Sequence, residues 1–368
     1  MLINQAKFLE PSWEPWAPQG PLDRQIIVLM SGGVDSSVTA HLLRETGWEI
    51  LGVTMRIPSF DGQQSCGGAD AAAVCRELGL CHYVIDVTGV FSQCVIEPFQ
   101  KAYQNGRTPN PCIDCNTQLK FSLVWDLAQE VFGVRHLATG HYARVTQTET
   151  GPRLGRGVDH GKDQSYFLYG ISREKLPYLH LPLGDYEKDY TRDTATRIGL
   201  TVADKAESME LCFAGAADYR QALNQEQRHH PGPLTDMSGQ VLGEHQGVAN
   251  YTLGQRRGLG FAGGKPLYVG RIEPANNTVA LGTRDELCTP RVTAEQLNIL
   301  IPELLQSGEF VRGKIRSYGN PNPCRIVAVG DNQMAVDFDD PIFAPCPGQR
   351  LVLYDKDDSV IAGGVISH

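Results

Sequence analysis

One segment of the chain has the residue types of a phosphate-binding loop. Residues 26–37 read IIVLMSGGVDSS, a short apolar run followed by glycine, serine and aspartate. Glycine lets a backbone approach an anion closely, and the first N–H groups of a following helix point toward such a ligand. The G-x-x-x-x-G-K-[ST] spacing of the Walker A loop occurs nowhere in the chain. The segment therefore predicts a phosphate cradle of another kind, the alternative being an ordinary glycine-rich turn.

Two cysteines far apart in the sequence could supply nucleophilic sulfur. Cys115 lies in NPCIDCN, after Cys112 and before a helix predicted over 117–132, and Cys212 lies in SMELCFAG. A thiol at a helix N-terminus has a depressed pKa because the helix dipole favours the thiolate, and the polar and proline neighbours of Cys115 predict an exposed loop. Two such thiols suggest sulfur transfer, in which one carries a persulfide and the other resolves it by exchange.

Other interpretations of the cysteines are weaker. A single C-x-x-C pair is poor evidence for zinc because structural sites need four ligands, so we expect no metal site built by the protein alone. A thioredoxin-type redox motif is disfavoured because the pair lies inside a longer strand–helix pattern. The remaining thiols that we interpret as buried and inert are Cys75, Cys94, Cys288 and Cys346.

The elements that must position these residues alternate between strand and helix from Gln25 to about Ala143. After the strand at 26–30, the pattern predicts helices at 37–46, 69–78, 90–105 and 117–132, and strands at 49–56, 81–87 and 136–139. This order predicts an α/β fold with a doubly wound parallel sheet, whose ligands bind at the C-terminal ends of the strands.

The second half of the chain predicts a different architecture. After Asp218, turns rich in glycine, proline and asparagine separate short apolar runs at 266–272, 278–281, 325–329 and 350–354. They predict two small, mainly antiparallel β domains. We expect an N-terminal extension at 1–24, which is rich in proline and loosely ordered, a catalytic domain at 25–215, a central β domain at 216–284 and a C-terminal barrel-like β domain at 285–368.

Composition limits the class of protein. The 368 residues are 41% hydrophobic and 20% charged, as in a globular enzyme, and the net charge of −9 argues against a bulk electrostatic grip on nucleic acid. The stretch 250–271 nevertheless carries four basic residues and no acid, so it is either a solvated face or a local phosphate-contact strip. No apolar run is long enough to cross a bilayer, and ten cysteines without a secretory signal predict the cytoplasm.

The motifs together resemble known families. SGGVDSS resembles the loop of the ATP pyrophosphatases (the PP-loop superfamily), which cleave ATP between its α and β phosphates and transfer AMP to an oxygen. TPNPCIDCN with LKF, ATGHYAR, GKDQSYFLYG, SMELCFAG, YTLGQRRGLG and PLYVG then follow in the order of the tRNA-specific 2-thiouridylases. This resemblance runs from about Gln25 to the C-terminus. It implies an adenine nucleotide alpha hydrolase-like domain and replacement of the C2 oxygen of the wobble uridine by sulfur.

The resemblance also implies roles for individual residues. Cys115 and Cys212 match the catalytic pair. The residues that match ATP-binding positions are Leu29, Met30, Ser31, Gly32, Gly33, Val34, Asp35, Ser36, Met55 and Gly140. Those that match positions at the target base or elsewhere on tRNA are Asn110, Pro111, Cys112, His141, Lys162, Asp163, Gln164, Arg316, Ser317 and Gln349. Many relatives carry aspartate at the position of Cys112, so in this chain a neighbouring thiol could compete with Cys115.

The implied mechanism uses ATP and Mg²⁺, with Asp35 helping to hold the metal. The base of uridine 34 would leave its stacked position in the anticodon stem-loop and enter the pocket, as base-modifying enzymes require. Adenylation of its C2 oxygen creates an AMP leaving group, and sulfur from Cys212 displaces it, leaving a Cys115–Cys212 disulfide. A cysteine desulfurase or a sulfur carrier protein would load Cys212.

Two other functions stay open from the sequence. A PP-loop amidotransferase or ligase for a small molecule would share the ATP loop but need neither cysteine, and a noncatalytic RNA-binding protein would use the C-terminal β domains. Gly258, Gly260 and Gly263 match G-x-G-x-x-G, but no helix can follow, so they predict a turn that presents Arg256 and Arg257. Without the resemblance, Lys162 and Asp163 could be a surface ion pair.

Overall fold

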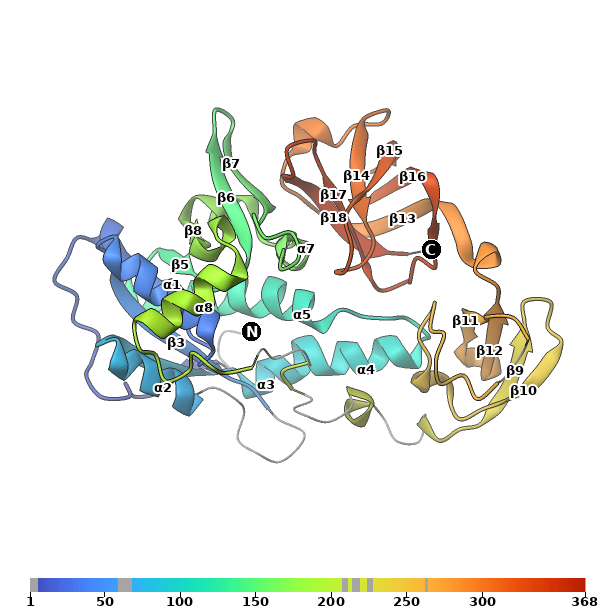
Figure 1. Ribbon diagram of the computed structural model, residues 1–368, viewed down its shortest axis with the longest axis horizontal. Helices are drawn as coiled ribbons and strands as arrows, with labels where there is room; N and C mark the ends of the chain where they lie inside the picture. The colour runs from blue at the N-terminus through green and yellow to red at the C-terminus, as the bar shows by residue number, and fades with distance from the viewer. Residues whose placement is uncertain are drawn as a thin grey trace. The chain divides into compact units, whose positions relative to one another are not determined.

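The computed structural model describes residues 6–58, 68–206, 211–213, 219–223, 228–261 and 264–367 (Figure 1). The chain forms two compact units. Unit 1 comprises Met1–Val95, Cys112–Ala216 and Asp358–Val360, and unit 2 comprises Ile96–Pro111, Ala217–Asp357 and Ile361–His368. The segment before Cys112 therefore belongs with the C-terminal half of the chain, although it lies in the N-terminal half of the sequence.

Unit 1 is built on a six-stranded sheet with the order β1-β4-β3-β2-β5-β8. Its strands are β1 (Lys7–Phe8), β2 (Gln25–Leu29), β3 (Glu49–Arg56), β4 (Cys81–Asp86), β5 (His136–Ala138) and β8 (Leu179–His180). β1 is antiparallel to β4, and the other pairs are parallel, with Ile27 opposite both Leu51 and Leu137. The predicted α/β fold with a parallel sheet is confirmed.

The central strand β2 is apolar on both faces, so both faces of the sheet must be covered. Ile26 and Val28 pack in a core cluster with residues of the helices α1 (Val34–Glu45), α2 (Gly68–Glu77) and α8 (Lys188–Arg197). Ile27 alternates to the opposite face and is also fully buried. The chain runs from β2 to β3 and β4 on one side and returns to β5 on the other, so the topological switch point lies at the C-terminal end of β2.

The cysteine-bearing helix begins earlier than predicted. α5 (Pro111–Asp114), the π-helix η4 (Cys115–Val124) and α6 (Trp125–Phe132) follow one another without a break, because the junction residues Asp114 and Val124 are themselves helical. Gly133, in the left-handed region at φ 72°, ends this helix. The predicted start at Thr117 is therefore wrong, since proline at the first position initiates the helix at Pro111.

Residues 6–24 of the N-terminal segment pack against the sheet, so the expectation of a loosely ordered extension is wrong for them. β1 extends the sheet, and the amide of Leu9 donates to the carbonyl of Val84 (2.9 Å). The Phe8 ring packs edge-on against Tyr83 and Phe132, and Trp13 stacks on His82. The aromatic side chains of this proline-rich segment therefore pack against the edge of the sheet.

The other elements of unit 1 are short. They are α3 (Thr88–Phe91), the hairpin β6 (Ala143–Thr148) and β7 (Gly151–Arg156), α7 (Ser165–Leu168), and the 3₁₀ helices η2 (Leu22–Arg24), η5 (Arg173–Tyr178) and η6 (Pro182–Asp185). The π-helix η3 (Ser92–Ile96) leads into α4 (Glu97–Gln104). Within the described residues, no helix combines the length and the apolar character needed to cross a bilayer.

Unit 2 contains the predicted β domains. A four-stranded sheet has the order β10-β9-β12-β11, and a closed barrel has the order β13-β16-β15-β14-β17-β18. The sheet strands are β9 (Gly232–Asp236), β10 (Val241–His245), β11 (Tyr268–Glu273) and β12 (Thr278–Gly282). The barrel strands are β13 (Cys288–Ile299), β14 (Phe310–Lys314), β15 (Asn322–Val329), β16 (Gln333–Phe343), β17 (Arg350–Tyr354) and β18 (Val360–Ile366). β9 and β12 are parallel. The pairs β10–β9, β11–β12, β13–β16, β13–β18, β14–β15, β14–β17 and β15–β16 are antiparallel.

Short 3₁₀ turns connect the strands of unit 2. They are η7 (Tyr219–Ala222), η8 (Val248–Asn250), η9 (Pro274–Asn276), η10 (Asp285–Leu287) and η11 (Pro302–Leu304). Gly258 and Gly260 adopt left-handed conformations at φ 68° and 69°, and β11 is the next regular element among the described residues. The expectation that no dinucleotide-binding helix follows these glycines is confirmed, whereas Gly263 lies outside the described residues.

Candidate active site

The predicted phosphate loop lies at the switch point, between β2 and α1. Gly32 has φ 71°, a conformation that other residues adopt only with strain, and Gly33 is extended at the N-cap of α1. The first N–H groups of a helix have no intrahelical acceptor, and the glycine N-cap has no side chain that could bond them. This end of α1 can therefore donate to a bound anion.

The loop is held by its own hydroxyl groups. The amide of Ser31 donates to Ser36 Oγ (3.2 Å), and Ser36 Oγ donates to the carbonyl of Gly33 (3.2 Å). Ser37 Oγ donates to the same carbonyl (2.7 Å). The serines that were predicted as phosphate donors thus also define the shape of the loop.

A buried lysine that the sequence analysis missed neutralises Asp35. Lys188, only 8% exposed, donates from Nζ to Asp35 Oδ1 at 2.6 Å. The hydroxyl of Tyr142 lies 3.2 Å from the same oxygen and 2.9 Å from Thr191 Oγ1. Lys188 and Thr191 share α8, far from the loop in sequence, so no local spacing could have indicated this contact.

A second missed lysine contacts the loop backbone. Lys205 Nζ donates to the carbonyl of Gly32 (2.9 Å) and to Asp70 Oδ2 (2.6 Å). It lies seven residues before Cys212 in the sequence. Two cations, Lys188 and Lys205, therefore border the loop, which lacks a lysine of its own.

Gly140 belongs to the same site because of its close approach to the loop. A Cβ atom at Gly140 would lie 2.8 Å from the carbonyl carbon of Asp35 and 2.9 Å from the amide nitrogen of Ser36. Met55, half-buried, ends β3, the strand that neighbours β2. The structure thus brings Leu29–Ser36 and Gly140 together, and it places Met55 at the same edge of the sheet.

The environment of Cys115 differs from the prediction. This thiol is only 6% exposed and lies inside the helix, one turn after Pro111, rather than in an exposed loop. Burial, the largest effect, raises the pKa of the Cys115 thiol to about 12. The expected depressed pKa is therefore wrong, because loss of hydration outweighs the helix dipole at this position.

The predicted catalytic cysteines nevertheless lie close enough to interact. Cys112 and Cys212 both have solvent-exposed surface. Partial loss of hydration, and next the charge of Cys212, raise the pKa of the Cys112 thiol to about 11. The same charge contributes to the raised pKa of Cys115. The charge of Cys212 thus acts on both of the other thiols, and Cys112, Cys115 and Cys212 together are named the thiol cluster.

Lys120 is a further residue that the sequence analysis did not single out. Its positive charge lowers the pKa of both Cys112 and Cys115, partly opposing burial. It lies five residues after Cys115, the spacing that i→i+5 bonding of a π-helix brings onto one side. The sequence signal was the lysine in the LKF motif shortly after Cys115. Only the π-helix explains why Lys120 lies on the same side of the helix as Cys115.

Asn116 carries an unusual polar atom next to Cys115. Its Nδ2 donates to the carbonyl of Phe167 (3.1 Å), whereas its Oδ1 is buried without a hydrogen-bond partner among the described residues. A buried acceptor without a donor is costly, so it marks a position where a ligand group could donate. This acceptor lies beside the predicted catalytic thiol in the sequence.

The other cysteines fit the expectation in part. The structure confirms burial of Cys75, Cys94 and Cys346, but Cys288 is half-buried, so its predicted burial is wrong. All nine described cysteines are free of disulfides, and Cys66 lies outside the described residues. Among the described residues, no cluster of three or more His, Cys, Asp or Glu side chains could hold a metal ion.

Asp163, one of the predicted tRNA contacts in unit 1, is held inside the protein. The Asp163 carboxylate is fully buried: it binds Arg156 Nε (3.1 Å) and accepts from the amides of Gly157 (3.3 Å) and Ser165 (3.1 Å). The surface ion pair that the sequence left open is wrong, because the carboxylate is buried and pairs with Arg156. The carboxylate instead holds the loop that carries Lys162. The tRNA contact of Asp163 stays a prediction.

Lys162 lies in a polar hollow next to the phosphate loop. This hollow, about 330 Å³, is lined by Asp159, Lys162, Glu187, Lys188, Asp189 and Arg192. Lys188 is therefore shared between the hollow and Asp35. A predicted tRNA contact and the nucleotide loop thus lie on two sides of one lysine.

His141 and Gln164 complete the unit 1 set. His141 Nδ1 lies 2.8 Å from Thr139 Oγ1, and burial lowers the pKa of His141 to about 3, so its ring is neutral. Gln164 Oε1 accepts from the amide of Tyr142 (2.9 Å). His141 follows the C-terminal end of β5, the edge expected to hold ligands, and Gln164 is held there by its bond to Tyr142.

The predicted contacts in unit 2 lie on loops. Arg316 donates to the carbonyls of Phe343 (2.8 Å) and Ala344 (3.1 Å), and Ser317 is exposed beside it. Gln349 Nε2 donates to the carbonyl of Pro109 (3.2 Å), next to Asn110. The basic stretch is solvent-exposed at each described cation: Arg256, Arg257, Lys265 and Arg271.

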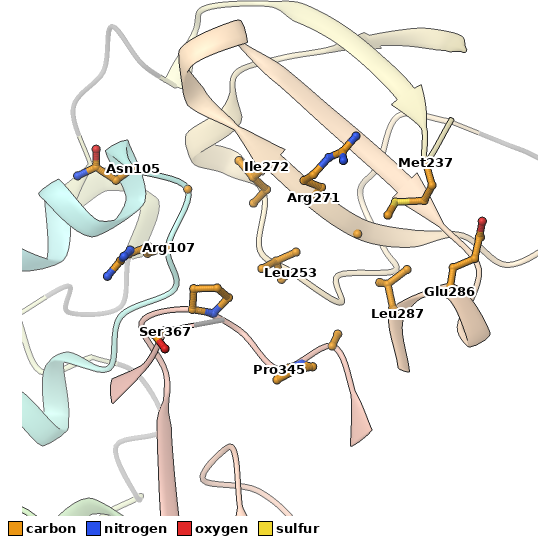
Figure 2. A pocket seen from close by; sticks show the side chains of 14 residues that line it. Asn105, Arg107, Met237, Leu253, Arg271, Ile272, Glu286, Leu287, Pro345 and Ser367 are labelled. Carbon is orange, nitrogen blue, oxygen red and sulfur yellow. The ribbon is translucent and has the colours of Figure 1, made fainter. Parts of the chain in front are cut away.

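Unit 2 also contains a cavity of about 440 Å³ lined by both polar and apolar side chains (Figure 2). Leu253, Ile272, Leu287 and Pro345 contribute to its lining, together with the end of α4. None of the predicted site residues lines it. The Arg271 guanidinium points away from Leu253 in Figure 2 and pairs with Glu273 (2.7 Å).

Comparison with known protein families covers nearly the whole chain. Residues 24–216 match the family described as tRNA methyl transferase HUP domain. Residues 220–283 match the tRNA methyl transferase PRC-barrel domain, and residues 291–366 match the aminomethyltransferase beta-barrel domain.

Curated relatives are similar over almost their full length. The tRNA-specific 2-thiouridylase MnmA of Carboxydothermus hydrogenoformans is 41% identical over 361 residues, covering 93% of this chain and 97% of the relative. The tRNA-specific 2-thiouridylase MnmA 1 of Syntrophus aciditrophicus is 42% identical over 352 residues, with 94% and 93% covered. The tRNA-specific 2-thiouridylase MnmA of Clostridioides difficile is 38% identical over 357 residues, covering 94% of this chain and 98% of the relative.

Solved structures overlap with this chain less completely. NMN synthetase from Francisella tularensis is 18% identical, with 56% of this chain and 75% of that chain covered at a TM-score of 0.33. A subunit assigned to a tRNA methyltransferase from Methanocaldococcus jannaschii is 18% identical, with 47% and 74% covered at 0.32. At these TM-scores neither likeness bears on function.

Proposed function

Because the chain belongs to the tRNA-specific 2-thiouridylase family, we propose that it is a tRNA-uridine 2-sulfurtransferase that replaces the C2 oxygen of uridine 34 by sulfur, with ATP as co-substrate. The observation that carries the proposal is the presence, in the same unit, of a phosphate loop and of the cysteines that match the catalytic pair. Neither alone would distinguish a sulfurtransferase from a ligase or a redox protein.

The nucleotide step rests on the loop between β2 and α1. The N-terminus of α1 and the loop hydroxyls would receive the phosphates of ATP, with Lys188 and Lys205 supplying positive charge. The C2 oxygen of uridine attacks the α-phosphorus, and pyrophosphate leaves. Adenylation is needed because an amide-like C2 carbonyl does not expel oxide, whereas AMP is a good leaving group.

Mg²⁺ fits this site through one protein ligand. Mg²⁺ usually takes one or two carboxylates together with phosphate oxygens and water, and Asp35 supplies a carboxylate at the loop. One of its oxygens already binds Lys188, which leaves the other for the metal. The ion would neutralise charge on the phosphates and on the departing pyrophosphate.

The sulfur step rests on the thiol cluster. An upstream donor, a cysteine desulfurase or a sulfur carrier protein, loads Cys212 as a persulfide, which the exposure of Cys212 permits. The terminal sulfur attacks C2 and expels AMP. The Cys115 thiolate then attacks the inner sulfur of Cys212, which releases 2-thiouridine and forms a Cys115–Cys212 disulfide that an external thiol must reduce.

The protonated state of Cys115 imposes a condition on this sequence. A thiol with a pKa of about 12 is almost entirely protonated near neutral pH, and a thiol is a poor nucleophile. We propose that Cys115 becomes reactive only when the adenylated base enters and the packing around the thiol opens. Lys120 would then stabilise the thiolate, since its charge already acts in that direction.

The tRNA is proposed to bind through loops of both units. His141, Lys162 and Gln164 in unit 1, and Arg316, Ser317, Gln349 and the basic stretch in unit 2, are the candidate contacts. Asn110, Pro111 and Cys112 precede Cys115 and would meet the flipped base. We place the enzyme in the cytoplasm and propose domain limits at residues 24, 215 and 284.

The experiment that tests this proposal measures two products of the reaction. Purified protein is incubated with a tRNA bearing uridine 34, Mg-ATP and a cysteine desulfurase with cysteine, and 2-thiouridine and pyrophosphate are both measured. We expect Cys212→Ser to abolish 2-thiouridine while ATP and tRNA binding persist, and the control Cys288→Ser to behave as wild type. Pyrophosphate release without tRNA would indicate a small-molecule ligase, and tRNA binding without ATP consumption would indicate a noncatalytic binder.

A further inference from the structure

A buried histidine outside the site connects the N-terminal segment to the phosphate loop. His82, on β4, is fully buried, and its Nδ1 lies 2.7 Å from Ser12 Oγ. Its Nε2 lies 2.8 Å from Thr54 Oγ1 on β3. Thr54 Oγ1 donates to the carbonyl of Met30 (2.8 Å), the residue that enters the loop from β2. Four residues therefore form one hydrogen-bonded relay within unit 1.

The donor and acceptor at each link follow from chemistry. The Met30 carbonyl can only accept, so the single proton of the Thr54 hydroxyl is used there. His82 Nε2 must then be the donor to Thr54 Oγ1. Burial lowers the pKa of His82 to about 4, so the ring is neutral and Nδ1 can only accept, from Ser12 Oγ. Each hydrogen bond of the relay is therefore donated in the same direction, from Ser12 toward the Met30 carbonyl.

The relay fixes the peptide plane that opens the phosphate loop. The amide of Met30 donates to the carbonyl of Val53 (2.8 Å), while its own carbonyl accepts from Thr54. In a trans peptide the C=O and the next N–H point in opposite directions. Holding the Met30 carbonyl toward Thr54 therefore turns the Ser31 amide toward Ser36 Oγ, which it reaches at 3.2 Å.

The N-terminal segment is itself fastened at this point. The amide of Ser12 donates to the carbonyl of His82 (2.9 Å), and the Trp13 ring stacks on the His82 ring at 6.0 Å between centroids. Arg76 of α2 covers the other part of Trp13 at 5.3 Å. Ser12 is therefore presented to the histidine by backbone and ring contacts.

We propose that His82 is a positioning residue for the nucleotide loop, through which Ser12 of the N-terminal segment sets the orientation of the Met30–Ser31 peptide and hence the affinity for ATP. This inference rests on the proposed function for the assignment of ATP to the loop. His82 would touch neither ATP nor tRNA, and its effect passes through Thr54.

The test measures the dissociation constant of Mg-ATP by calorimetry for single and double variants of the full chain. Thr54→Val should weaken ATP binding about tenfold, because it removes the donor to Met30 and leaves a buried carbonyl unpaired. Thr54→Ser, which keeps the hydroxyl, should bind ATP as wild type does. Ser12→Ala should weaken binding about threefold, and Ser12→Thr should restore it.

A relay also predicts non-additivity. The double variant Ser12→Ala/Thr54→Val should bind ATP no more weakly than Thr54→Val alone, since both changes act through His82. The matched control is Thr46→Val, whose hydroxyl donates to the carbonyl of Leu43 (2.9 Å) at the far end of α1. This control should leave ATP affinity unchanged.

The outcomes separate the two proposals. Urea unfolding without ATP checks that every variant is folded. If wild type binds ATP but Thr54→Val and Ser12→Ala bind it equally well, the relay is overturned and the proposed function stands. Fully additive losses would also overturn the relay. A wild-type chain without affinity for ATP would overturn both.

Discussion

The phosphate loop and the thiol cluster lie in the same unit, but they differ in how far each is prepared for its proposed chemical step. The loop is fixed by hydrogen bonds from Ser31, Ser36 and Ser37, and Lys188 neutralises its carboxylate. In the thiol cluster, burial keeps the Cys115 thiol protonated, with a pKa of about 12. One region can bind its ligand as it stands, whereas the other must change its environment before it can react.

This difference suits the order of the proposed reaction. A Cys115 thiolate exposed before adenylation would react with solvent oxidants or attack the Cys212 persulfide too early. A thiol that stays protonated until the activated base arrives avoids such losses. The predictions below test whether the two regions are separable in this way.

The largest effect is expected within the thiol cluster. Cys115→Ser should reduce multiple-turnover formation of 2-thiouridine by roughly a thousandfold, because the resolving nucleophile is lost, and leave ATP affinity intact. Cys112→Ser should change it by less than about twofold, as expected for an exposed substitution. Nucleoside mass spectrometry measures both. Loss of thiolation only in Cys112→Ser would transfer the resolving role to Cys112.

The protonation state of Cys115 is tested by alkylation. Below a pKa of about 12, the thiolate fraction rises tenfold per pH unit, so iodoacetamide should label Cys115 about a hundred times faster at pH 9 than at pH 7. Peptide mass spectrometry gives the rate for each cysteine.

Cys75 provides the control for this measurement. Burial also raises its pKa to about 12, but it is fully enclosed in the core, so its labelling should be slower than that of Cys115 at every pH. A Cys115 rate that is independent of pH would contradict the protonated state. Equal rates for the two cysteines in the presence of tRNA and Mg-ATP would contradict the proposed opening around Cys115.

A steric change should damage the loop alone. Gly140→Ala places a methyl group about 2.8 Å from the backbone of Asp35, so the loop must shift. We expect ATP affinity to fall roughly 30-fold, equivalent to about 2 kcal/mol of overpacking. Calorimetry measures the affinity, and Gly68→Ala, where the Cβ has open space, is the control. An unchanged affinity would show that Gly140 does not shape the nucleotide site.

The smallest expected effect concerns charge at the loop. Lys188→Met should weaken Mg-ATP binding roughly tenfold, because it removes a charge-assisted hydrogen bond and leaves Asp35 facing the phosphates. Arg291→Met is the control, since it breaks only the exposed pair with Asp337 in unit 2. If both variants bind ATP equally well, Lys188 has only a structural role.

The sequence predicted the loop region well because its rules are local. The strand 49–56 was predicted with the bounds that β3 has, and Leu29–Ser36 lies where a strand end meets a helix start. The glycine at position 32 has the positive φ that its residue type allows. Apolar periodicity and glycine placement are sufficient for such a segment.

The parts that failed depend on tertiary contacts. The depressed pKa of Cys115 was inferred from a helix start, but the helix begins at Pro111 and the thiol is buried. Lys188 and Lys205 reach the loop from distant segments, which no spacing rule detects. Asp163 looked like a surface residue, yet its carboxylate is enclosed by Arg156 and two amides.

The two outermost strands of the unit 1 sheet have a consequence for self-association. β1 and β8 each span only two residues, and β1 begins with the exposed Lys7. A long bare edge would offer unpaired amides and carbonyls to another chain, and short, charged borders are a common protection against such pairing. The N-terminal residues thus shield β4 from intermolecular β-sheet growth, which matters for an enzyme that must remain dispersed among the RNAs it modifies.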